Sequence, residues 1–432
     1  MAVRVQGYVA ALLFFGASQV TGIACSAMGR SKPWAFRGSI RAQSAAEVGT
    51  IMELHSKLPW VGTTIFSQMS QLAQQVGALN LSQGFPDFPA DPRLLTALNQ
   101  QVLAGHNQYA PMIGVAQLRE QIATLTAHCY QRVVDPEHEI TVTSGATEAL
   151  FVAIQALVRP GDEVIVFDPA YDSYEPAVAL AGGRTVHIQL DAPDFSVDWA
   201  EVAKAVTART RLIIVNSPHN PTGMVFSAAD FAALEAIVVA HQLYCISDEV
   251  YEHMVFSAAP RTSAHRFAAL AARSFIVSSF GKTFHVTGWK LGYCVAPMAL
   301  SVEFRKIHQY VTFSSFTPAQ YAIAQLLQHH GELVDELAGF YQAKRDLFRQ
   351  LLAQSRLQLL PCAGTYFQLA DYSAISELDD IEFCRWLTIE HGVAAIPLSV
   401  FSHAKPSTKI VRFCFAKQQS TLQQAAERLC LL

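Results

Sequence analysis

The sequence of 432 residues is poor in charge, and its cationic residues do not cluster. Only 15% of the residues are charged, and 31 Lys plus Arg against 35 Asp plus Glu give a net charge of -4. A protein that binds a phosphate backbone usually presents a basic face or a basic run. No run of 18 or more apolar residues occurs either, so a membrane-spanning helix is not expected. The composition therefore argues against nucleic-acid and membrane partners.

The cysteines and histidines lack the spacings of common metal sites. The eight cysteines are widely separated and include no C-x-x-C pair, a usage typical of buried free thiols in a reducing compartment. The fifteen histidines form no H-E-x-x-H motif and no Cys/His cluster. No metal site is predicted on these grounds.

The first 51 residues differ from the rest of the chain. Arg4 precedes an apolar run at residues 8–15, and small residues follow at 24–27, an order that resembles a signal peptide. The alternative is that the residues before Met52 reflect an upstream start site and are disordered, because regular hydrophobic patterning begins only after them. The cysteine usage favours this second interpretation and a cytoplasmic location.

A chain of this length is expected to form two cooperating domains. Between residues 135 and 295, short β-branched runs alternate with helical patterns, which is typical of a mostly parallel sheet flanked by helices. After residue 311, long helical patterns give way to mixed strand and helix, which predicts a smaller α+β domain. The expected α/β fold comprises a leader (1–51), an arm with part of the small domain (52–93), a large domain (94–311) and a small C-terminal domain (312–432).

The apolar runs of the expected large domain predict individual elements. Helical patterns at residues 146–157 and 228–241 are long enough to cross over a sheet. The predicted strands cover residues 163–167, 185–189, 212–216, 245–248, 275–279 and 291–296.

Residues 278–283 (SSFGKT) follow a predicted strand and contain a lysine that could serve three kinds of chemistry. The tripeptide GKT could end a P-loop, but that motif needs a glycine where Ile276 stands. Ser279, three residues before Lys282, could belong to a serine acyl-enzyme pair, but the S-D-N and K-T-G elements are absent. Lys282 could instead form a Schiff base with a carbonyl cofactor. Because a lone lysine is more often at the surface, this interpretation needs support from other residues.

Several residues supply what a pyridoxal 5'-phosphate (PLP) cofactor would need. A buried carboxylate must stand beside the pyridine nitrogen, and Asp248 ends an apolar strand. The phosphate needs a helix N-terminus with free N–H groups, and residues 144–147 (SGAT) directly precede an apolar-periodic helix. Tyr251 lies three residues after Asp248 and could reach the same group. Taken singly, these signals also fit an ordinary cap or a core aromatic.

Two further residues point to the same chemistry. Asn220 lies in residues 216–223 (NSPHNPTG), where two prolines and a glycine form a loop rigid enough to aim its amide, although an ordinary tight turn is the alternative. Arg412 lies in the strand-like residues 409–415 (KIVRFCF), where an inward arginine is costly unless it meets an anion. An α-carboxylate matches the planar guanidinium.

In combination, these residues resemble the fold-type I, PLP-dependent aminotransferases of class I/II, in the branch of kynurenine and methionine aminotransferases. The resemblance covers residues 53–432 and is nearest to the bacterial methionine aminotransferases. It implies an aspartate aminotransferase-like fold, PLP as the cofactor, and ping-pong transfer of the α-amino group of a neutral L-amino acid (methionine, an aromatic amino acid or kynurenine) to a 2-oxo acid. The motifs follow the family's order at residues 81–88 (LSQGFPDF), 107–109 (NQY), 220–223 (NPTG), 247–251 (SDEVY) and 279–283 (SFGKT).

The resemblance also implies roles around the cofactor. Lys282 would carry PLP, Asp248 would pair with the pyridine nitrogen, and Tyr171 would stack on the ring. Tyr251 and Asn220 would hold the ring's 3'-oxygen. The residues implied at the phosphate are Gly145, Ala146, Thr147, Ser279, Lys290 and, reaching across a homodimer, Tyr109.

For the substrate, the resemblance implies that Arg412 and Gly84 receive the carboxylate, with Asn220 beside them and Phe85 near the side chain. The freed amine of Lys282 would then move a proton between the substrate Cα and the cofactor. No arginine has a context that marks it for a second carboxylate, so neutral substrates are favoured over aspartate. A β-lyase acting on cysteine conjugates would use the same lysine and remains the alternative.

Overall fold

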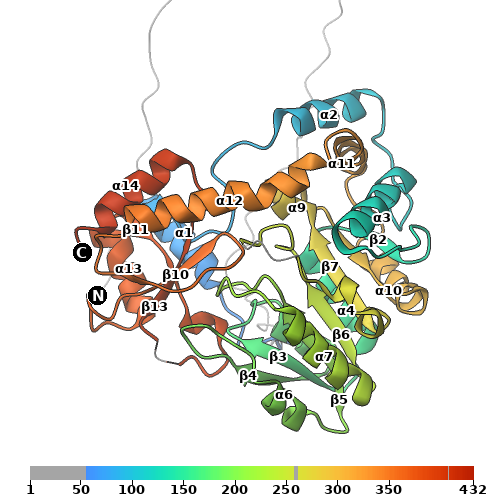
Figure 1. Cartoon of the computed structure of the whole chain (residues 1–432), viewed down its shortest axis with the longest axis horizontal. Coiled ribbons are helices and arrows are strands. Elements are labelled where there is room, and N and C mark those ends of the chain that lie inside the picture. Colours follow the sequence, from blue (N-terminus) through green and yellow to red (C-terminus); the bar gives the residue numbers. More distant parts are fainter. Residues whose placement is uncertain (1–54, 257–260, 407) are drawn as a thin grey trace, which may run out of the picture. The chain divides into compact units, whose positions relative to one another are not determined.

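A computed structural model describes residues 55–256, 261–406 and 408–432. The leader predicted over residues 1–51 lies outside these ranges. The described chain folds around two main sheets, one of seven strands and one of four (Figure 1). None of the helices in the described ranges is long and apolar enough to cross a membrane.

The seven-stranded sheet has the order β2-β8-β7-β6-β5-β3-β4. The strands from β7 to β4 are parallel, whereas β8 runs antiparallel to both of its neighbours. Every residue of β3 and β7 is buried, as expected for strands covered by helices on both faces. The strands are β2 (Ile140–Thr143), β3 (Glu163–Asp168), β4 (Arg184–Gln189), β5 (Thr210–Asn216), β6 (Tyr244–Asp248), β7 (Ser274–Ser279) and β8 (Gly292–Val295).

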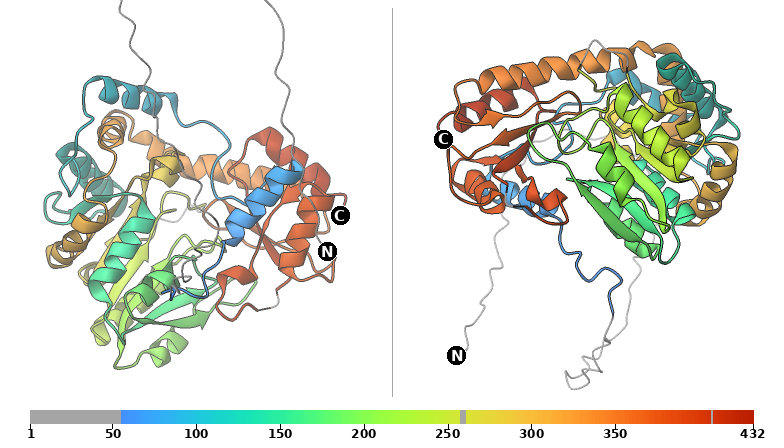
Figure 2. Two further views of the ribbon diagram at one scale, coloured as in Figure 1. Left: turned by 180° about the vertical axis from the view of Figure 1, so that it is seen from behind. Right: turned by 60° about the horizontal axis from the view of Figure 1, so that its bottom comes forward.

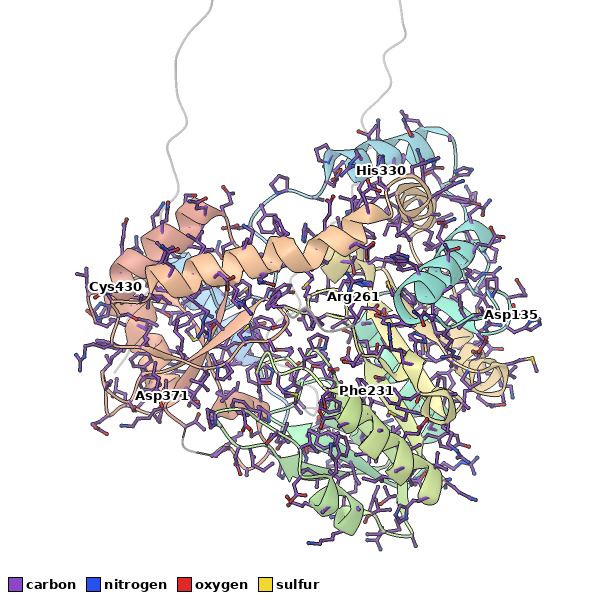
Figure 3. The ribbon with its side chains drawn as sticks, viewed as in Figure 1. Asp135, Phe231, Arg261, His330, Asp371 and Cys430 are labelled. Atoms are coloured by element: carbon purple, nitrogen blue, oxygen red, sulfur yellow. The ribbon has the colours of Figure 1, made fainter. Side chains whose placement is uncertain are left out.

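Helices cover both faces of this sheet because successive strand side chains point to opposite sides. On β5, Leu212 and Ile214 join one hydrophobic cluster, while Ile213 and Val215 join another. Phe231 of α7, labelled in Figure 3, is fully buried in the second cluster. One face carries α4 (Ala146–Leu157), α5 (Tyr174–Leu180) and α10 (Met298–Val311), and the other carries α6 (Trp199–Ala205), α7 (Ala228–Ala240) and α8 (Ala268–Ala271).

Capping residues set where helix α7 begins. The Ser227 hydroxyl accepts from the Asp230 N–H at 3.2 Å, and the Asp230 carboxylate accepts from the Ser227 N–H at 2.8 Å. This reciprocal arrangement is a capping box, which satisfies two N–H groups that the helix itself cannot. The helix predicted over residues 228–241 is therefore confirmed within one residue.

The smaller sheet is antiparallel, in the order β12-β13-β10-β9. An early segment joins this part of the fold, because β1 (Leu79–Asn80) pairs in parallel with β11 (Val393–Ala394). Figure 2 shows α1, in blue, beside the red C-terminal elements, in agreement with its packing on α13. The other elements here are α1 (Ile65–Val76), β9 (Gln358–Leu359), β10 (Phe367–Asp371), α13 (Asp380–Glu390), β12 (Ile396–Pro397), η3 (Ser399–Phe401), β13 (Ile410–Cys414) and α14 (Gln419–Leu429).

One long helix packs into two hydrophobic clusters. Near the start of α12, Val334 joins the cluster formed by α2, α3 and α11, whereas Tyr341 and Phe348 join the cluster that includes the smaller sheet. Figure 1 shows α12, in orange, running from beside α11 to beside α14. The helices of this region are α2 (Pro92–Leu103), α3 (Ala116–Tyr130), α11 (Thr317–His329) and α12 (Glu332–Leu351).

The packing of α12 gives a stability prediction. Phe348 is fully buried and packs edge-on against Phe413 of β13, so Phe348→Ala should lower the free energy of unfolding by about 3–5 kcal/mol. The matched control is Phe340→Ala on the same helix, where the side chain is 42% exposed. Urea unfolding at fixed protein and PLP concentration measures both, and equal losses would contradict the assignment of Phe348 to the core.

Candidate active site

The parallel strands of the larger sheet end at a common edge in polar residues. β5 ends at Asn216, β6 at Asp248 and β7 at Ser279. Because parallel strands point the same way, their carboxyl ends meet where ligands bind in open α/β sheets. A cavity of about 310 Å³ lies at this edge, and all three residues line it.

The structure brings nearly all of the predicted site residues to this cavity. Phe85 and Tyr109 are the exceptions. Phe85 lies under the Lys417 ammonium, 4.9 Å from it, and Tyr109 is 83% exposed with its ring edge-on to Phe313. The predicted residues that line the cavity are Gly84, Gly145, Ala146, Thr147, Tyr171, Asn220, Asp248, Tyr251, Ser279, Lys282, Lys290 and Arg412.

Lys282 lies on α9 (Phe280–Thr283), a single helical turn directly after β7. Its Nζ donates a hydrogen bond to the Gly84 carbonyl at 3.3 Å and lies 5.7 Å from the ring centres of Tyr251 and Tyr366. The side chain reaches the cavity, but protein atoms surround it closely, and this desolvation lowers the pKa of Lys282 to about 8. A lowered pKa increases the neutral fraction of the amine, which a nucleophilic lysine requires.

Asp248 is the buried carboxylate of the cavity. Its Oδ2 accepts a hydrogen bond from the Tyr174 hydroxyl at 2.6 Å, and its Oδ1 accepts one from the Val250 N–H at 3.4 Å. Burial raises the pKa of Asp248 to about 6, and these hydrogen bonds oppose the increase. A carboxylate in this setting favours a protonated partner, because a nearby positive charge would stabilise its ionised form.

A chain of hydrogen bonds connects β6, the loop after β5 and the smaller sheet. Asn216 Nδ2 donates to the Asp248 carbonyl at 2.8 Å, and Asn216 Oδ1 accepts from the Asn220 N–H at 2.7 Å. Asn220 Oδ1 in turn accepts from Arg412 Nη1 at 2.6 Å. The loop that the sequence predicts to be rigid is therefore held at its start, Asn216, and at its middle, Asn220.

Arg412 is a buried cation on β13. Its Nη2 donates to the Ser82 carbonyl at 3.2 Å, and its guanidinium lies 3.9 Å from the ring centre of Phe367. The Nε atom is buried and has no hydrogen-bond partner among the described residues, in which Arg412 also forms no ion pair. Burial lowers the pKa of Arg412 to about 10, so the group stays charged at neutral pH. An unpaired buried guanidinium is suited to an anionic ligand.

The start of α4 forms an anion-binding corner of the cavity. Gly145, at φ 78°, precedes the helix, and no side chain of the described residues caps its first N–H groups. The hydroxyls of Thr147 and Tyr171 lie 3.4 Å apart at this corner. Ser279 and Lys290 line the same cavity. Free helix N–H groups, hydroxyls and a lysine together fit a phosphate.

Some residues of the site were not predicted from the sequence. Phe66 and Phe367 line the cavity, and Tyr366 donates to the Gly84 carbonyl at 2.6 Å. Tyr174 holds Asp248, and its position at the start of a short helix directly after Tyr171 could have indicated this role. The three others lie outside the motifs, Phe66 on α1, Phe367 at the start of β10 and Tyr366 directly before it.

The residues of the cavity fit PLP group by group. Lys282 suits its carbonyl carbon, because desolvation favours the neutral amine. Asp248 suits a protonated ring nitrogen, because its carboxylate is buried. The uncapped start of α4, with Lys290, suits the phosphate.

Comparison with known proteins agrees with this geometry. The family model for aminotransferase class I and II matches residues 76–429. Methionine aminotransferase from Escherichia coli (strain K12) is 57% identical over 374 residues, which cover 87% of this chain and 97% of that protein. Kynurenine–oxoglutarate transaminase 1 of Mus musculus is 35% identical over 407 residues, with 86% and 94% covered. The crystal structure of the Escherichia coli protein YbdL, identified as a methionine aminotransferase, matches with a TM-score of 0.87 at 56% identity and covers 88% of this chain and 100% of that one.

These matches confirm the predicted aspartate aminotransferase-like fold and PLP as the cofactor. The β-lyase alternative finds no support in the relatives described above, which are all transaminases by name. The chain therefore belongs to the class I and II aminotransferases, which are PLP-dependent enzymes.

Proposed function

We propose that this aminotransferase takes the α-amino group of a neutral L-amino acid, L-methionine first, and passes it to a 2-oxo acid by a ping-pong mechanism. Its similarity to methionine and kynurenine transaminases supports this substrate class. One observation carries the proposal: Arg412 is a buried arginine that lines the cavity, and aromatic rings surround its guanidinium. No second arginine of the described residues lines the cavity, so a distal carboxylate would lack a partner there.

The substrate carboxylate binds Arg412 in this proposal. Its Nε is the free buried donor, and the rings of Phe66, Phe367 and Phe401 lie 3.9–5.4 Å from the guanidinium. These rings exclude water and strengthen the pairing with a carboxylate. Gly84 leaves room beside them, because a Cβ there would lie 2.9 Å from the Phe367 ring. Asn220 orients Arg412. Phe85, which follows Gly84 but lies outside the lining of the cavity, is placed near the substrate side chain on the family resemblance alone.

Lys282, Asp248 and Tyr251 form the catalytic group. When bound, PLP supplies the electron sink that weakens the bond from the substrate Cα to its proton. Lys282 Nζ, in its neutral form, would accept that proton and hold it for the return step. Asp248 keeps the ring nitrogen protonated, and Tyr174 holds Asp248 in place. Tyr251 and Asn220 hold the ring's 3'-oxygen, as the family resemblance implies.

The remaining cofactor contacts are also part of the proposal. Tyr171 would stack on the ring, and the residues that would hold the phosphate are Gly145, Ala146, Thr147, Ser279 and Lys290, which all line the cavity. Tyr109 reaches the phosphate in the other subunit of a homodimer. Its high exposure and its absence from the lining of its own cavity support this role.

The organisation of the chain is proposed as a large domain (94–311) and a small domain (312–432), with residues 52–93 as an arm that joins the small one. The pairing of β1 with β11 supports the placement of the arm. A cytoplasmic location is proposed from the free cysteines of the described residues.

Single-turnover chemistry tests the substrate class. Holoenzyme mixed with L-methionine and no 2-oxo acid should release 4-methylthio-2-oxobutanoate stoichiometrically, while L-aspartate should react at least about 100-fold more slowly because its second carboxylate is desolvated without a partner. Lys282→Ala should release no product, and the surface variant Lys306→Ala should behave as wild type. Equal rates for the two amino acids would refute the neutral-substrate proposal. Pyruvate and ammonia formed from a cysteine conjugate without any acceptor would indicate a lyase.

Arg412→Lys tests the carboxylate site. The variant keeps the charge but loses the planar fork, so the KM for L-methionine should rise about 10- to 100-fold with a smaller change in kcat. The control is Arg184→Lys, an exposed position on β4 outside the cavity. Steady-state kinetics at saturating 2-oxo acid measures both, and an unchanged KM in Arg412→Lys would show that the carboxylate binds elsewhere.

The pKa of Lys282 predicts how the apoenzyme recaptures PLP. Only the neutral amine attacks a carbonyl, so the rate should rise about tenfold per pH unit below pH 8 and level off above it, whereas an ordinary lysine would continue to gain until beyond pH 10. Stopped-flow absorbance follows the reaction. Pyridoxamine phosphate, which has no carbonyl, serves as the control. The pH dependence of its binding rate should not change slope near pH 8. A break above pH 10 would mean that burial does not lower this pKa.

A further inference from the structure

A second group of polar side chains lies where α5, β4 and the loop after η3 meet, outside the lining of the cavity. It consists of Glu175, His187 and His403, here called the two-histidine cluster. One ligand atom from each residue lies within 4.8 Å of the others. His403 Nδ1 is 3.2 Å and His187 Nε2 is 3.9 Å from the same oxygen, Glu175 Oε1. The two imidazole rings stack with their centres 4.5 Å apart.

Asp168, at the end of β3, orients the two-histidine cluster. Its Oδ1 lies 3.0 Å from His187 Nδ1, and its Oδ2 accepts from the His403 backbone N–H at 2.7 Å. A carboxylate that accepts from Nδ1–H fixes the tautomer of the imidazole and leaves the lone pair on Nε2. The carboxylate–histidine pair is the usual support behind a metal-binding imidazole.

Among the described residues, no hydrogen-bond donor lies within reach of His187 Nε2. His187 Nε2 is buried and has no hydrogen-bond partner among the described residues. Glu175 Oε1, which lies 3.9 Å from it, is itself an acceptor. Two acceptors that face each other in a partly buried place repel, and a cation between them would turn this repulsion into attraction.

We propose that Glu175, His187 and His403 bind a divalent transition-metal ion, with Zn²⁺ as the probe. Two imidazoles and one carboxylate form a donor set that suits Zn²⁺. Ligand atoms around tetrahedral zinc lie about 3.3–3.5 Å apart, given bonds of about 2.0–2.2 Å, so the separations of 3.2 and 3.9 Å are close to this range. The two stacked imidazoles would have to turn out of their stack for both lone pairs to point at one ion, and the exposed His403 has room to do so. His403 is exposed, which gives the ion access and leaves a coordination position for water.

The ion would join segments that are distant in the sequence. Glu175 and His187 belong to α5 and β4 of the larger sheet, whereas His403 follows η3, which is next to the smaller sheet. Two hydrogen bonds already connect the end of β3 and the loop after it to the segment around η3. The Ala170 N–H donates to the Phe401 carbonyl at 2.6 Å, and the His403 N–H donates to Asp168 Oδ2 at 2.7 Å. A metal bound only by the folded chain should therefore raise the thermal midpoint of unfolding.

Calorimetric titration of metal-free holoenzyme with Zn²⁺ tests the proposal. Wild type should show one saturable site per chain, and both His403→Ala and Glu175→Gln should weaken it by more than about tenfold. The matched control is His138→Ala, another exposed histidine beside a carboxylate, which should leave the affinity unchanged. Because His403 is exposed, its variant should fold normally, and circular dichroism with the PLP absorbance verifies this.

Two further measurements make the outcome decisive. Co²⁺ difference spectra should show ligand-field bands in wild type that His403→Ala lacks, and Zn²⁺ should raise the thermal midpoint of wild type but not of that variant. The absence of saturable binding would overturn the proposal. Equal affinity in wild type and His403→Ala would place the ion elsewhere and would also overturn it.

Discussion

The burial of three charged side chains in one cavity is the constraint on which the rest of the structure depends. Asp248, Lys282 and Arg412 lie at the edge of the larger sheet. Desolvation favours the neutral form of each side chain, because it raises the pKa of Asp248 and lowers the pKa of Lys282 and of Arg412. Burying a charge without a full set of partners costs stability, which the hydrophobic clusters on both faces of the sheet must offset. The cavity is thus left with unmet interactions that a dianionic, aromatic ligand and a carboxylate substrate can satisfy.

Much of the larger sheet could be predicted from the sequence, because its strands are short apolar runs and its helices carry their own caps. The strand predicted over residues 212–216 begins only two residues earlier in the structure, and α4 has the predicted bounds. β2 (Ile140–Thr143) was missed, because four residues that alternate with threonine carry little signal until β8 pairs with them. Beside the smaller sheet, β1 and β11 form a separate pair of strands, which are two residues each and exist only through their pairing.

The residues of the candidate site also fall into two groups, those that a local sequence pattern marks and those that it does not. Residues that close a strand or open a helix, such as Asp248 and Gly145, have local signatures and could be found. Phe66 and Phe367 contribute through packing between distant segments, which no local pattern records. The two-histidine cluster belongs to this second class, because residues 175, 187 and 403 have no spacing that would mark a metal site.

The double anchoring of α12 has a mechanical consequence. A helix of 20 residues is about 30 Å long, and its rigidity lets it act as a lever between the clusters at its ends. A tilt of about 5° about one end displaces the other by about 2.6 Å, which is close to half a helical turn. A small rearrangement where Val334 packs among α3 and α11 would therefore be amplified at Phe348, beneath the strand that carries Arg412.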